Sequence, residues 1–405
     1  MFDVEKIREE FPILSRKVYG KPLTYLDSGA TAQKPRCVVE KMSELLLNDN
    51  ANIHRGVHLL SEEMTARYEE SREVVRSFIG AIHREEVVFT SGATMSLNLV
   101  ASSWCEKHLG EGDNVVVSHI EHHSNIVPWQ LATERKGAEL RVIPVADDGS
   151  LELDRLDSLI DERTKVVAIT QASNTLGTKP DLARIIAKAH SVGAVAVVDG
   201  CQGVVHGGVD VVALDCDFYA FSGHKLYGPT GIGVLYGKRE LLDDIPPYMG
   251  GGDMVDKVSF AKTTYAPVPL KFEAGTSNFI GAIGLAEAIK FLQSLPAKEV
   301  EQHEKMLLDY ATEQLLQIEG LRIYGTTADK APIISFNVDG CDHYDIGMIL
   351  DKLGVAVRTG HHCAEPTMHR FGTNGVVRAS IALYNNKEDI DALVRGVKRA
   401  VAMLK

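Results

Sequence analysis

Short runs of β-branched and aromatic residues alternate with amphipathic stretches between residues 85 and 237. The runs that read as strands are Val87–Thr90, Val115–Ser118, Val166–Thr170, Val195–Asp199 and Phe218–Phe221. In the stretch Leu182–His190 the apolar residues recur at helical intervals, and Gly193 follows as a suitable C-cap. Continuous apolar strands that alternate with helices are typical of a mainly parallel sheet covered on both faces. The pattern therefore predicts a large α/β domain.

The pattern changes after about residue 285. A long helical region is interrupted at Pro296, because proline cannot continue the hydrogen-bond ladder, and leads into two short apolar runs and a final helix. These elements are residues 282–318, 333–336, 355–357 and 387–404. They predict a smaller α+β domain, against which we expect the N-terminal segment to pack. The expected division is 1–20 for that segment, 21–285 for the large domain and 286–405 for the small C-terminal domain.

Composition and charge narrow the class of protein. A length of 405 residues suits two domains, and 45% hydrophobic with 24% charged residues can build a large core. The net charge of −12 disfavours nucleic acid and anionic membranes as partners, since both need a basic face. No apolar run approaches the ~18 residues that span a bilayer, and the N-terminus has no apolar signal region. The six scattered cysteines form no CxxC pair, which favours free thiols, so we expect a cytoplasmic protein.

Polar and titratable residues follow the carboxyl ends of all five predicted strands. These segments are Ser91–Thr94, His119–His123, Gln171–Asn174, Asp199–Gln202 and Ser222–Lys225. In an open α/β sheet, ligands bind beyond the carboxyl ends of the strands. Polar residues also mark ordinary turns, and this alternative explains one or two of the five segments. It does not explain polar residues at all five strand ends. The sequence therefore predicts one binding site along this rim.

Three of these segments suit pyridoxal phosphate. Gly92-Ala93-Thr94, between a strand and a helix, offers backbone N–H groups and a hydroxyl to a phosphate, although a plain helix N-cap is an equal alternative. Asp199 closes a buried strand and can keep a pyridine nitrogen protonated, unless it too is only a cap. His122 can stack on a flat ring. A metal at His122-His123 is disfavoured, because no HExxH motif and no third ligand accompany the pair.

Lys225 is the strongest single candidate for covalent chemistry. It follows Ser222-Gly223-His224 at a strand end, where desolvation and a nearby cofactor would free its amine to form an imine. A lone lysine is more often an exposed loop residue, but these neighbours favour the catalytic interpretation. The nearby segment Gly228–Gly233 lacks the Lys-Ser/Thr of a P-loop and reads as a turn into the next strand.

In this order, the motifs resemble the aminotransferase class V branch of the fold type I pyridoxal-phosphate enzymes. Within that branch the chain is most similar to the group II, SufS-like cysteine desulfurases, also described as selenocysteine lyases. The resemblance spans essentially the whole chain. The motifs that carry it are Leu26–Ala30, His54–His58, Glu121–Asn125, Asp199–Gln202, Phe221–Gly231, Phe272–Thr276 and Arg358–Ala364.

The resemblance implies a role for each matching residue. For the cofactor it implies Lys225 as the Schiff-base lysine, His122 as the stacking ring, Asp199 at the pyridine nitrogen, Gln202 at the phenolic oxygen, and Thr94, Ser222 and His224 at the phosphate. Thr276 would reach the phosphate of a second subunit, which implies a homodimer. For the substrate it implies Asn174 and Arg378 at the carboxylate, with Ala30, His54, Arg55 and Arg358 nearby. Cys363 would be the nucleophile that accepts sulfur.

The implied reaction converts L-cysteine into L-alanine and leaves a persulfide on Cys363, whose thiolate is the reactive form. Arg358 and the pair His361-His362 can favour that thiolate; the alternative is an inert buried thiol. The family also implies a small SufE-like or SufU-like sulfur acceptor and a role in iron–sulfur cluster assembly. Four other functions stay open: selenocysteine lyase, cysteine-sulfinate desulfinase, aminotransferase, and a sulfur-delivery scaffold with weak turnover of its own.

Two stretches depart from the family pattern. Gly92-Ala93-Thr94-Met95 stands where the family often has two threonines and a glutamate after the glycine, and Gly29-Ala30 stands where an alanine pair is usual. Neither departure removes a residue that the reaction needs. We expect both to alter phosphate affinity or substrate fit only slightly.

Overall fold

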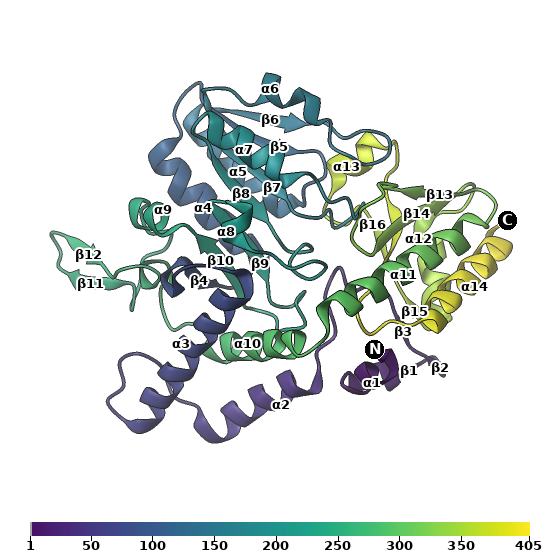
Figure 1. Ribbon diagram of the computed structural model, residues 1–405, viewed down its shortest axis with the longest axis horizontal. Helices are drawn as coiled ribbons and strands as arrows, with labels where there is room; N and C mark the ends of the chain where they lie inside the picture. Colours follow the sequence, from purple (N-terminus) through teal and green to yellow (C-terminus); the bar gives the residue numbers. More distant parts are fainter. Residues whose placement is uncertain (1) are drawn as a thin grey trace.

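The apolar runs in the middle of the chain form one sheet. In the computed structural model, which describes residues 2–405, seven strands lie in the order β4-β10-β9-β8-β7-β5-β6 (Figure 1). Their bounds are β4 Val87–Thr90, β5 Asn114–Ser118, β6 Glu139–Ile143, β7 Thr164–Thr170, β8 Val195–Asp199, β9 Phe218–Ser222 and β10 Gly233–Gly237. Only β10 runs antiparallel to its neighbours, so the prediction of a mainly parallel sheet is confirmed. The edge strand β6 was not predicted, because its residues are largely half-buried or exposed and its sequence is mixed.

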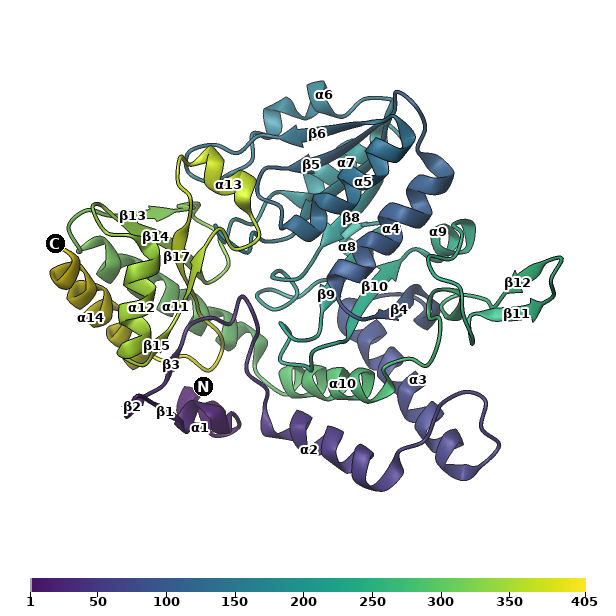
Figure 2. The ribbon, with the colours of Figure 1, turned by 180° about the vertical axis from the view of Figure 1, so that it is seen from behind.

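Helices cover both faces of this sheet because successive strand residues point to opposite sides. Val166 of β7 joins one core with residues of α4 (Ala93–His108) and α5 (Val127–Lys136). Val167 joins the other core with residues of α3, α7 and α10. Figure 2 shows α4 and α5 in front of the sheet in that view. The bounds of the second layer are α3 Leu59–Ile79, α7 Leu182–Ser191 and α10 Phe279–Gln293.

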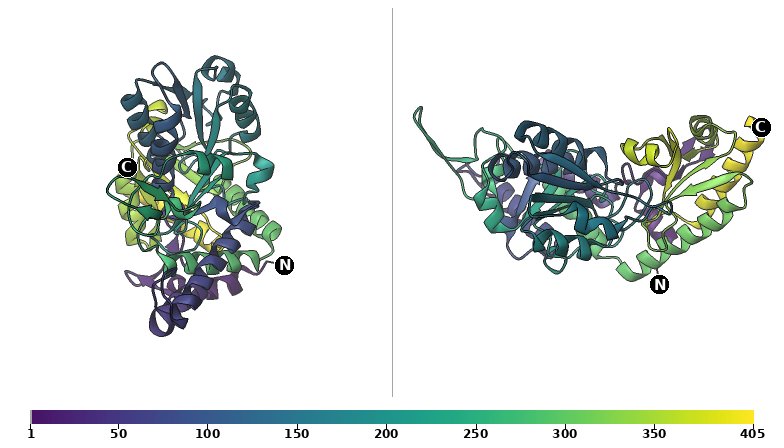
Figure 3. Two further views of the ribbon diagram at one scale, coloured as in Figure 1. Left: turned by 90° about the vertical axis from the view of Figure 1, so that its left-hand side faces the viewer. Right: turned by 90° about the horizontal axis from the view of Figure 1, so that it is seen from above.

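The C-terminal part has its own sheet and its own core. An antiparallel sheet of order β13-β14-β17-β16 packs with α11, α12 and α14, as the right-hand view of Figure 3 shows from above. The bounds are α11 Ala297–Leu316, β13 Leu321–Tyr324, β14 Ile333–Val338, α12 His343–Lys352, β16 Arg358–Gly360, β17 Val376–Ser380 and α14 Lys387–Leu404. The chain bends by 85° between α10 and α11 at the predicted break, Pro296.

The N-terminal residues lie against this C-terminal part. From α1 (Val4–Glu9), Arg8 donates to the Tyr384 carbonyl at 2.6 Å and pairs with Asp389 of α14 at 2.9 Å. Farther on, β3 (Thr24–Tyr25) pairs in parallel with β15 (Val355–Ala356). The division at residues 20 and 285 stays a proposal, and this pairing joins residues 24 and 25 to the smaller part as well.

The other elements are short or peripheral. They are β1 Lys17–Val18, β2 Lys21–Pro22, α2 Arg36–Glu44, α6 Leu156–Leu159, α8 Val211–Leu214, α9 Arg239–Asp244, β11 Val255–Val258, β12 Thr263–Tyr265 and α13 Glu365–Arg370. Within residues 2–405, no single helix is long and apolar enough to cross a membrane; α10 and α11 meet that test only when counted as one span across their bend.

Candidate active site

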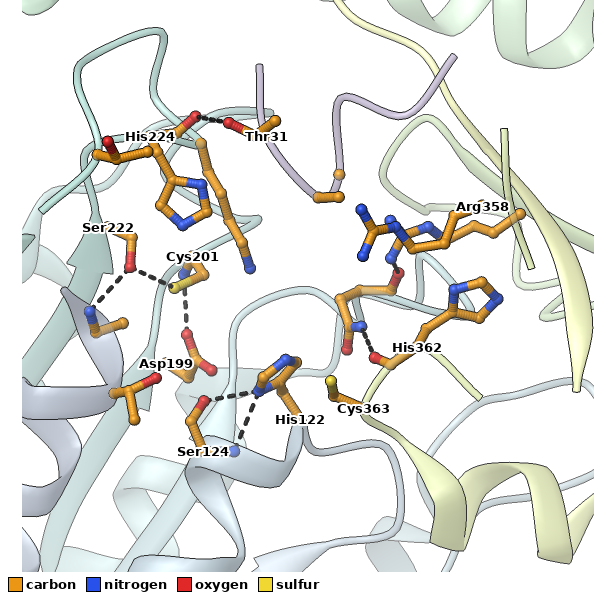
Figure 4. Close-up of a pocket in the computed structure, with 18 residues that line it drawn as sticks. Thr31, His122, Ser124, Asp199, Cys201, Ser222, His224, Arg358, His362 and Cys363 are labelled. Carbon is orange, nitrogen blue, oxygen red and sulfur yellow. Dashed lines mark hydrogen bonds between the residues drawn. The ribbon is translucent and has the colours of Figure 1, made fainter. Parts of the chain in front are cut away.

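A cavity of about 410 Å³ opens between the two parts, at the carboxyl ends of β5, β7, β8 and β9 (Figure 4). This is the rim on which the sequence placed a site. The predicted residues that line the cavity are Ala30, Thr94, His122, Asn174, Asp199, Ser222, His224, Lys225, Arg358, Cys363 and Arg378. Cys201, Ser124, Thr31, Thr230 and His362 line it too. We call residues 93–230 of the lining the large-domain wall and residues 358–378 the small-domain wall.

Asp199 is the buried anion of the large-domain wall. It is the last residue of β8, and its Oδ1 accepts the Cys201 N–H at 3.0 Å. Its second oxygen has no hydrogen-bond partner among residues 2–405. Asp199 lines the cavity, so its carboxylate is open to a ligand there. Asp199 therefore has the chemistry to pair with a protonated ring nitrogen.

Lys225 supplies an amine to the same wall. It follows β9, it lines the cavity, and its amine makes no hydrogen bond or ion pair within the described residues. Burial, and then the Lys225 charge, lower the pKa of His122 and the pKa of His224 to about 4 each. Both histidine rings are therefore neutral at neutral pH. Because the Lys225 amine has no partner among the described residues, it is available to bond to a ligand.

His122 is held in one orientation by its neighbour Ser124. Its Nδ1 accepts the Ser124 N–H at 3.1 Å and lies 2.7 Å from the Ser124 hydroxyl (Figure 4). Because Nδ1 accepts, the neutral ring carries its proton on Nε2. Glu121 fixes the same turn: its carboxylate bonds to Ser118, Asn125 and the Thr170 N–H. Burial raises the pKa of Glu121 to about 8.

The start of α4 forms the end of the cavity nearest β9. The Ala93 N–H, the first of that helix, donates to Ser222 Oγ at 2.9 Å. Gly92 precedes it with φ +155°, a backbone angle that side chains disfavour, and a Cβ added at Gly233 would lie 2.4 Å from the Gly92 Cα. Because neither glycine has a side chain, the backbone at Gly92 and the backbone at Gly233 can lie in contact. The N-terminus of α4 is thus left open to an anion, and the hydroxyl groups of Thr94, Ser222 and Thr230 line the cavity beside it.

Together these groups fit pyridoxal phosphate. The partnerless oxygen of Asp199 matches a ring nitrogen, the unpaired amine of Lys225 matches an aldehyde, and the start of α4 matches a phosphate. The three lie around one cavity of a size that suits a small cofactor.

The small-domain wall carries Cys363 on a strained turn. His362 and Cys363 have φ of +54° and +56°, a left-handed pair of non-glycine residues of the kind that clusters at functional sites. The large domain holds this turn across the cavity: the His123 N–H donates to the Cys363 carbonyl at 2.7 Å, and Asn174 Nδ2 donates to the His362 carbonyl at 2.8 Å. Cys363 is exposed, so its thiol is accessible from the cavity.

Two arginines stand beside that turn. Arg378 of β17 is buried, and its Nη1 donates to the Asn174 carbonyl at 2.9 Å. Arg358 of β16 is its direct partner across the sheet. Asp27, which the sequence did not single out beyond its motif, accepts hydrogen bonds from both guanidinium groups. Only the folded chain shows this contact, because residues 27 and 358 are far apart in sequence.

Four predicted site residues do not line this cavity. Gln202 is buried and donates to the Gly29 carbonyl at 2.8 Å, so it lies behind the wall. His54 contacts Glu69 at 3.4 Å, Arg55 pairs with Asp253 at 2.6 Å, and Thr276 is exposed. The local signals for Ser124 and Thr230 were present in the quoted motifs. Asp27 also lies in a quoted motif, Leu26–Ala30, but no role was predicted for it.

Comparisons with known proteins agree with this geometry. The model of the family "Aminotransferase class-V" matches residues 24–393. A cysteine desulfurase of Enterobacter sp. (strain 638) is 51% identical over 399 residues, covering 98% of this chain and 98% of that protein. The crystal structure of the cysteine desulfurase CsdA of Escherichia coli, in an S-sulfonic acid form, shares 42% identity with a TM-score of 0.93 and covers 100% of both chains. An apo cysteine desulfurase of Thermococcus onnurineus NA1 shares 39% identity with a TM-score of 0.94, over 99% of this chain and 98% of that one.

Proposed function

The chain belongs to the aminotransferase class-V family, and we propose that it is a cysteine desulfurase that holds pyridoxal 5'-phosphate on Lys225 and transfers the sulfur of L-cysteine to Cys363. The observation that carries this proposal is the cavity itself. It brings an unpaired lysine amine and an accessible thiol to one space, from two parts of the chain. An aminotransferase needs the amine but has no use for the thiol.

The large-domain wall would hold the cofactor. Asp199 would bind the ring nitrogen, His122 would stack on the ring, and the start of α4 with Ser222 and His224 would bind the phosphate. When bound there, the cofactor would supply an electron sink for the substrate Cα. Lys225 Nζ then takes the Cα proton, since it is the amine that lines the cavity.

The small-domain wall would act on carboxylate and sulfur. Arg378 lines the cavity and would bind the substrate carboxylate, and Asn174, which accepts a hydrogen bond from Arg378, lines the cavity beside it. The Cys363 thiolate attacks the substrate sulfur, a new S–S bond forms, and the C–S bond breaks. The electron pair of that bond stays with the carbon, which takes up a proton. L-cysteine plus a protein thiol thereby become L-alanine plus a protein persulfide, with no outside oxidant.

Quantifying the products from different substrates tests the proposal. The protein should give equimolar L-alanine and sulfide from L-cysteine in the presence of a reductant, and the Cys363 peptide should gain one sulfur atom before reduction. L-selenocysteine, L-cysteine sulfinate and a keto acid should be offered in parallel, since faster turnover of one of them would favour a lyase, a desulfinase or an aminotransferase. Alanine that appears only with a partner protein would favour a delivery scaffold.

We further propose a homodimer in which Thr276, and with it His54 and Arg55, reaches the partner's cavity. Their absence from the cavity of their own chain supports this placement. Heterodimers of Lys225→Ala and Thr276→Ala chains, which contain one intact composite site, test it: they should recover activity that both homodimers lack.

The six free cysteines support a cytoplasmic location. We propose that the protein delivers sulfur there to a small acceptor protein for iron–sulfur cluster assembly.

A further inference from the structure

A buried carboxylate lies outside the cavity, between α3 and β4. Glu273 accepts two parallel hydrogen bonds from the Arg72 guanidinium, at 2.6 and 3.0 Å. The Tyr68 hydroxyl and the Phe89 N–H also donate to this carboxylate, each at 2.8 Å. The side chains of Glu273 and Arg72 are each only 1% exposed, and removal of either one would leave an uncompensated buried charge. Glu273 therefore fixes the segment that runs on to Thr276.

The same arginine links this carboxylate to the loop that precedes α3. Arg72 Nε donates to Glu69 at 3.1 Å, and the other carboxylate oxygen of Glu69 lies 3.4 Å from His54 Nε2. His54 has φ +71°, a left-handed angle that a non-glycine residue keeps only where its surroundings hold it. We call His54, Glu69, Arg72 and Glu273 the α3 network. It joins the loop at His54 and the segment at Thr276 into one unit.

Both ends of this unit lie outside the cavity of their own chain. His54, Arg55 and Thr276 do not line that cavity, and Arg55 and Thr276 are exposed. Val57 and Leu59, which follow in the same loop, are 96% and 65% exposed. Figure 1 shows α3 on the side of the large domain away from the small domain. Exposed apolar side chains that gather beside polar ones mark protein–protein surfaces, and a second copy of this chain would cover them.

We propose that Glu273 is a positioning residue for the cavity of the partner subunit. Through Arg72 and the segment up to Thr276, it holds Thr276 and His54 in the relative placement that the partner's cavity requires. The inference rests on the proposed function, because it assumes a homodimer in which these two residues cross to the partner. Glu273 does not line the cavity of its own chain. Its substitution should therefore impair the partner's cavity and spare its own.

Heterodimers that distribute two substitutions differently test this proposal. Cofactor-loaded dimers of two differently tagged chains are purified through both tags. In the trans heterodimer, one chain carries Lys225→Ala and the other carries Glu273→Gln. In the cis heterodimer, one chain carries both substitutions and the other is wild type. Each dimer keeps one cavity with Lys225, and the two dimers hold the same set of substitutions, so any difference between them comes from the placement of Glu273→Gln.

The cis heterodimer should be the weaker of the two. Its one cavity with Lys225 receives the Thr276 segment from the Glu273→Gln chain, whereas in the trans heterodimer that segment comes from a chain with Glu273 intact. The kcat/KM for L-cysteine, followed as L-alanine, should be about fivefold or more lower in cis than in trans, the effect of one lost positioning hydrogen bond. Pyridoxal phosphate retained after gel filtration should fall in the same order, and this second measurement needs no turnover.

Two outcomes would overturn the proposal. Equal values in the two heterodimers would show that Glu273 supports the fold of the whole dimer. A weaker trans heterodimer would show that Glu273 serves the cavity of its own chain. Glu73→Gln in the same two placements is the matched control, because Glu73 lies on α3 in an exposed pair with Arg76, and its cis and trans values should agree.

Two further variants keep the test decisive. If Glu273→Gln chains do not fold, Glu69→Gln takes their place with the same expected order, since Glu69 is 30% exposed and contacts both Arg72 and His54. Thr276→Ala in both placements separates this inference from the proposed function. Equal cis and trans values for Thr276→Ala would reject the composite cavity, and the inference with it. A difference for Thr276→Ala without one for Glu273→Gln would reject the inference alone.

Discussion

The two walls of the cavity are built in different ways. In the large-domain wall, Asp199, Ser222 and Lys225 lie within three residues of a strand end, and the strands themselves place them. In the small-domain wall, Cys363 and Arg378 take their positions from contacts with His123, Asn174 and Asp27 in distant segments. Cofactor chemistry thus depends on local strand ends, while substrate chemistry depends on how the two parts of the chain meet.

The walls also differ in electrostatics. The large-domain wall keeps neutral histidines beside one lysine and one buried aspartate. The small-domain wall concentrates two guanidinium groups on a single carboxylate. Damage to the first wall should therefore abolish all chemistry, and damage to the second should alter which substrate is used and where its sulfur goes.

The largest expected effect comes from Lys225→Ala. Loss of the attachment point and of the Cα base should reduce alanine formation by about 10³-fold or more. Borohydride reduction of the wild type followed by peptide mapping should find the pyridoxyl group on Lys225. Lys34, a neighbouring lysine whose pKa burial lowers to about 8, is the control position, and a label found there would contradict the assignment.

Cys363→Ala separates the two walls most sharply. The variant should bind cofactor and L-cysteine normally, yet form no persulfide and lose about 10² to 10³-fold in alanine production. L-selenocysteine should retain more activity, because selenium leaves more readily without attack. Cys201→Ala is the matched control: burial and Asp199 raise the pKa of Cys201 to about 12, so its thiol stays protonated and the persulfide yield should not change. Sulfur mapped to Cys201 would argue against this division of roles.

Arg378→Lys tests the grip on the carboxylate. A lysine ammonium cannot supply two parallel hydrogen bonds, so the KM for L-cysteine should rise roughly 10- to 100-fold with a smaller change in kcat. Steady-state kinetics at fixed pH would measure the changes in KM and kcat separately. An unchanged KM would move the carboxylate site away from the small-domain wall.

His362 should make the small-domain wall sensitive to acid. Burial, and then Arg378, lower the pKa of His362 to about 3, while the unfolded chain keeps about 6.5. Between these values the unfolded state binds the extra proton, so the stability present above pH 6.5 declines as the pH falls toward 3. His362→Gln should reduce the loss in urea midpoint between pH 7 and pH 5. An identical loss in both proteins would show that other groups govern the acid response.

The smallest effect is expected at His123, which positions the Cys363 turn. Its Nε2 accepts the Glu365 N–H at 3.2 Å, and burial followed by the His361 charge lowers the pKa of His123, which favours the neutral ring. His123→Ala should change the alkylation rate of Cys363 about two- to fivefold, and His123→Gln, which keeps an acceptor, should restore it. If the wild type, His123→Ala and His123→Gln alkylate Cys363 at equal rates, the His123 side chain does not position the turn, and the backbone hydrogen bonds alone hold it.

Sequence patterns predicted more of the large-domain wall than of the small-domain wall. The strands β4 and β8 match their predicted bounds, and Asp199, Ser222, His224 and Lys225 at the ends of β8 and β9 line the cavity, whereas Gln202 does not. Cys363, Arg358 and Arg378 entered through family resemblance, and no periodicity marked them. The left-handed turn at His362 and the charge sharing at Asp27 were not predicted.

The sequence by itself determined the mainly parallel sheet, the break at Pro296 and the lysine-bearing strand end, because each follows from periodicity or backbone chemistry within a few residues. The tertiary structure alone decided which residues share a hydrogen bond across the cavity. Asp27 meets Arg358 and Arg378 only because β3 pairs with β15 and the chain then runs beside β17. Such contacts join residues more than 300 positions apart, and no local pattern encodes a distance of that kind.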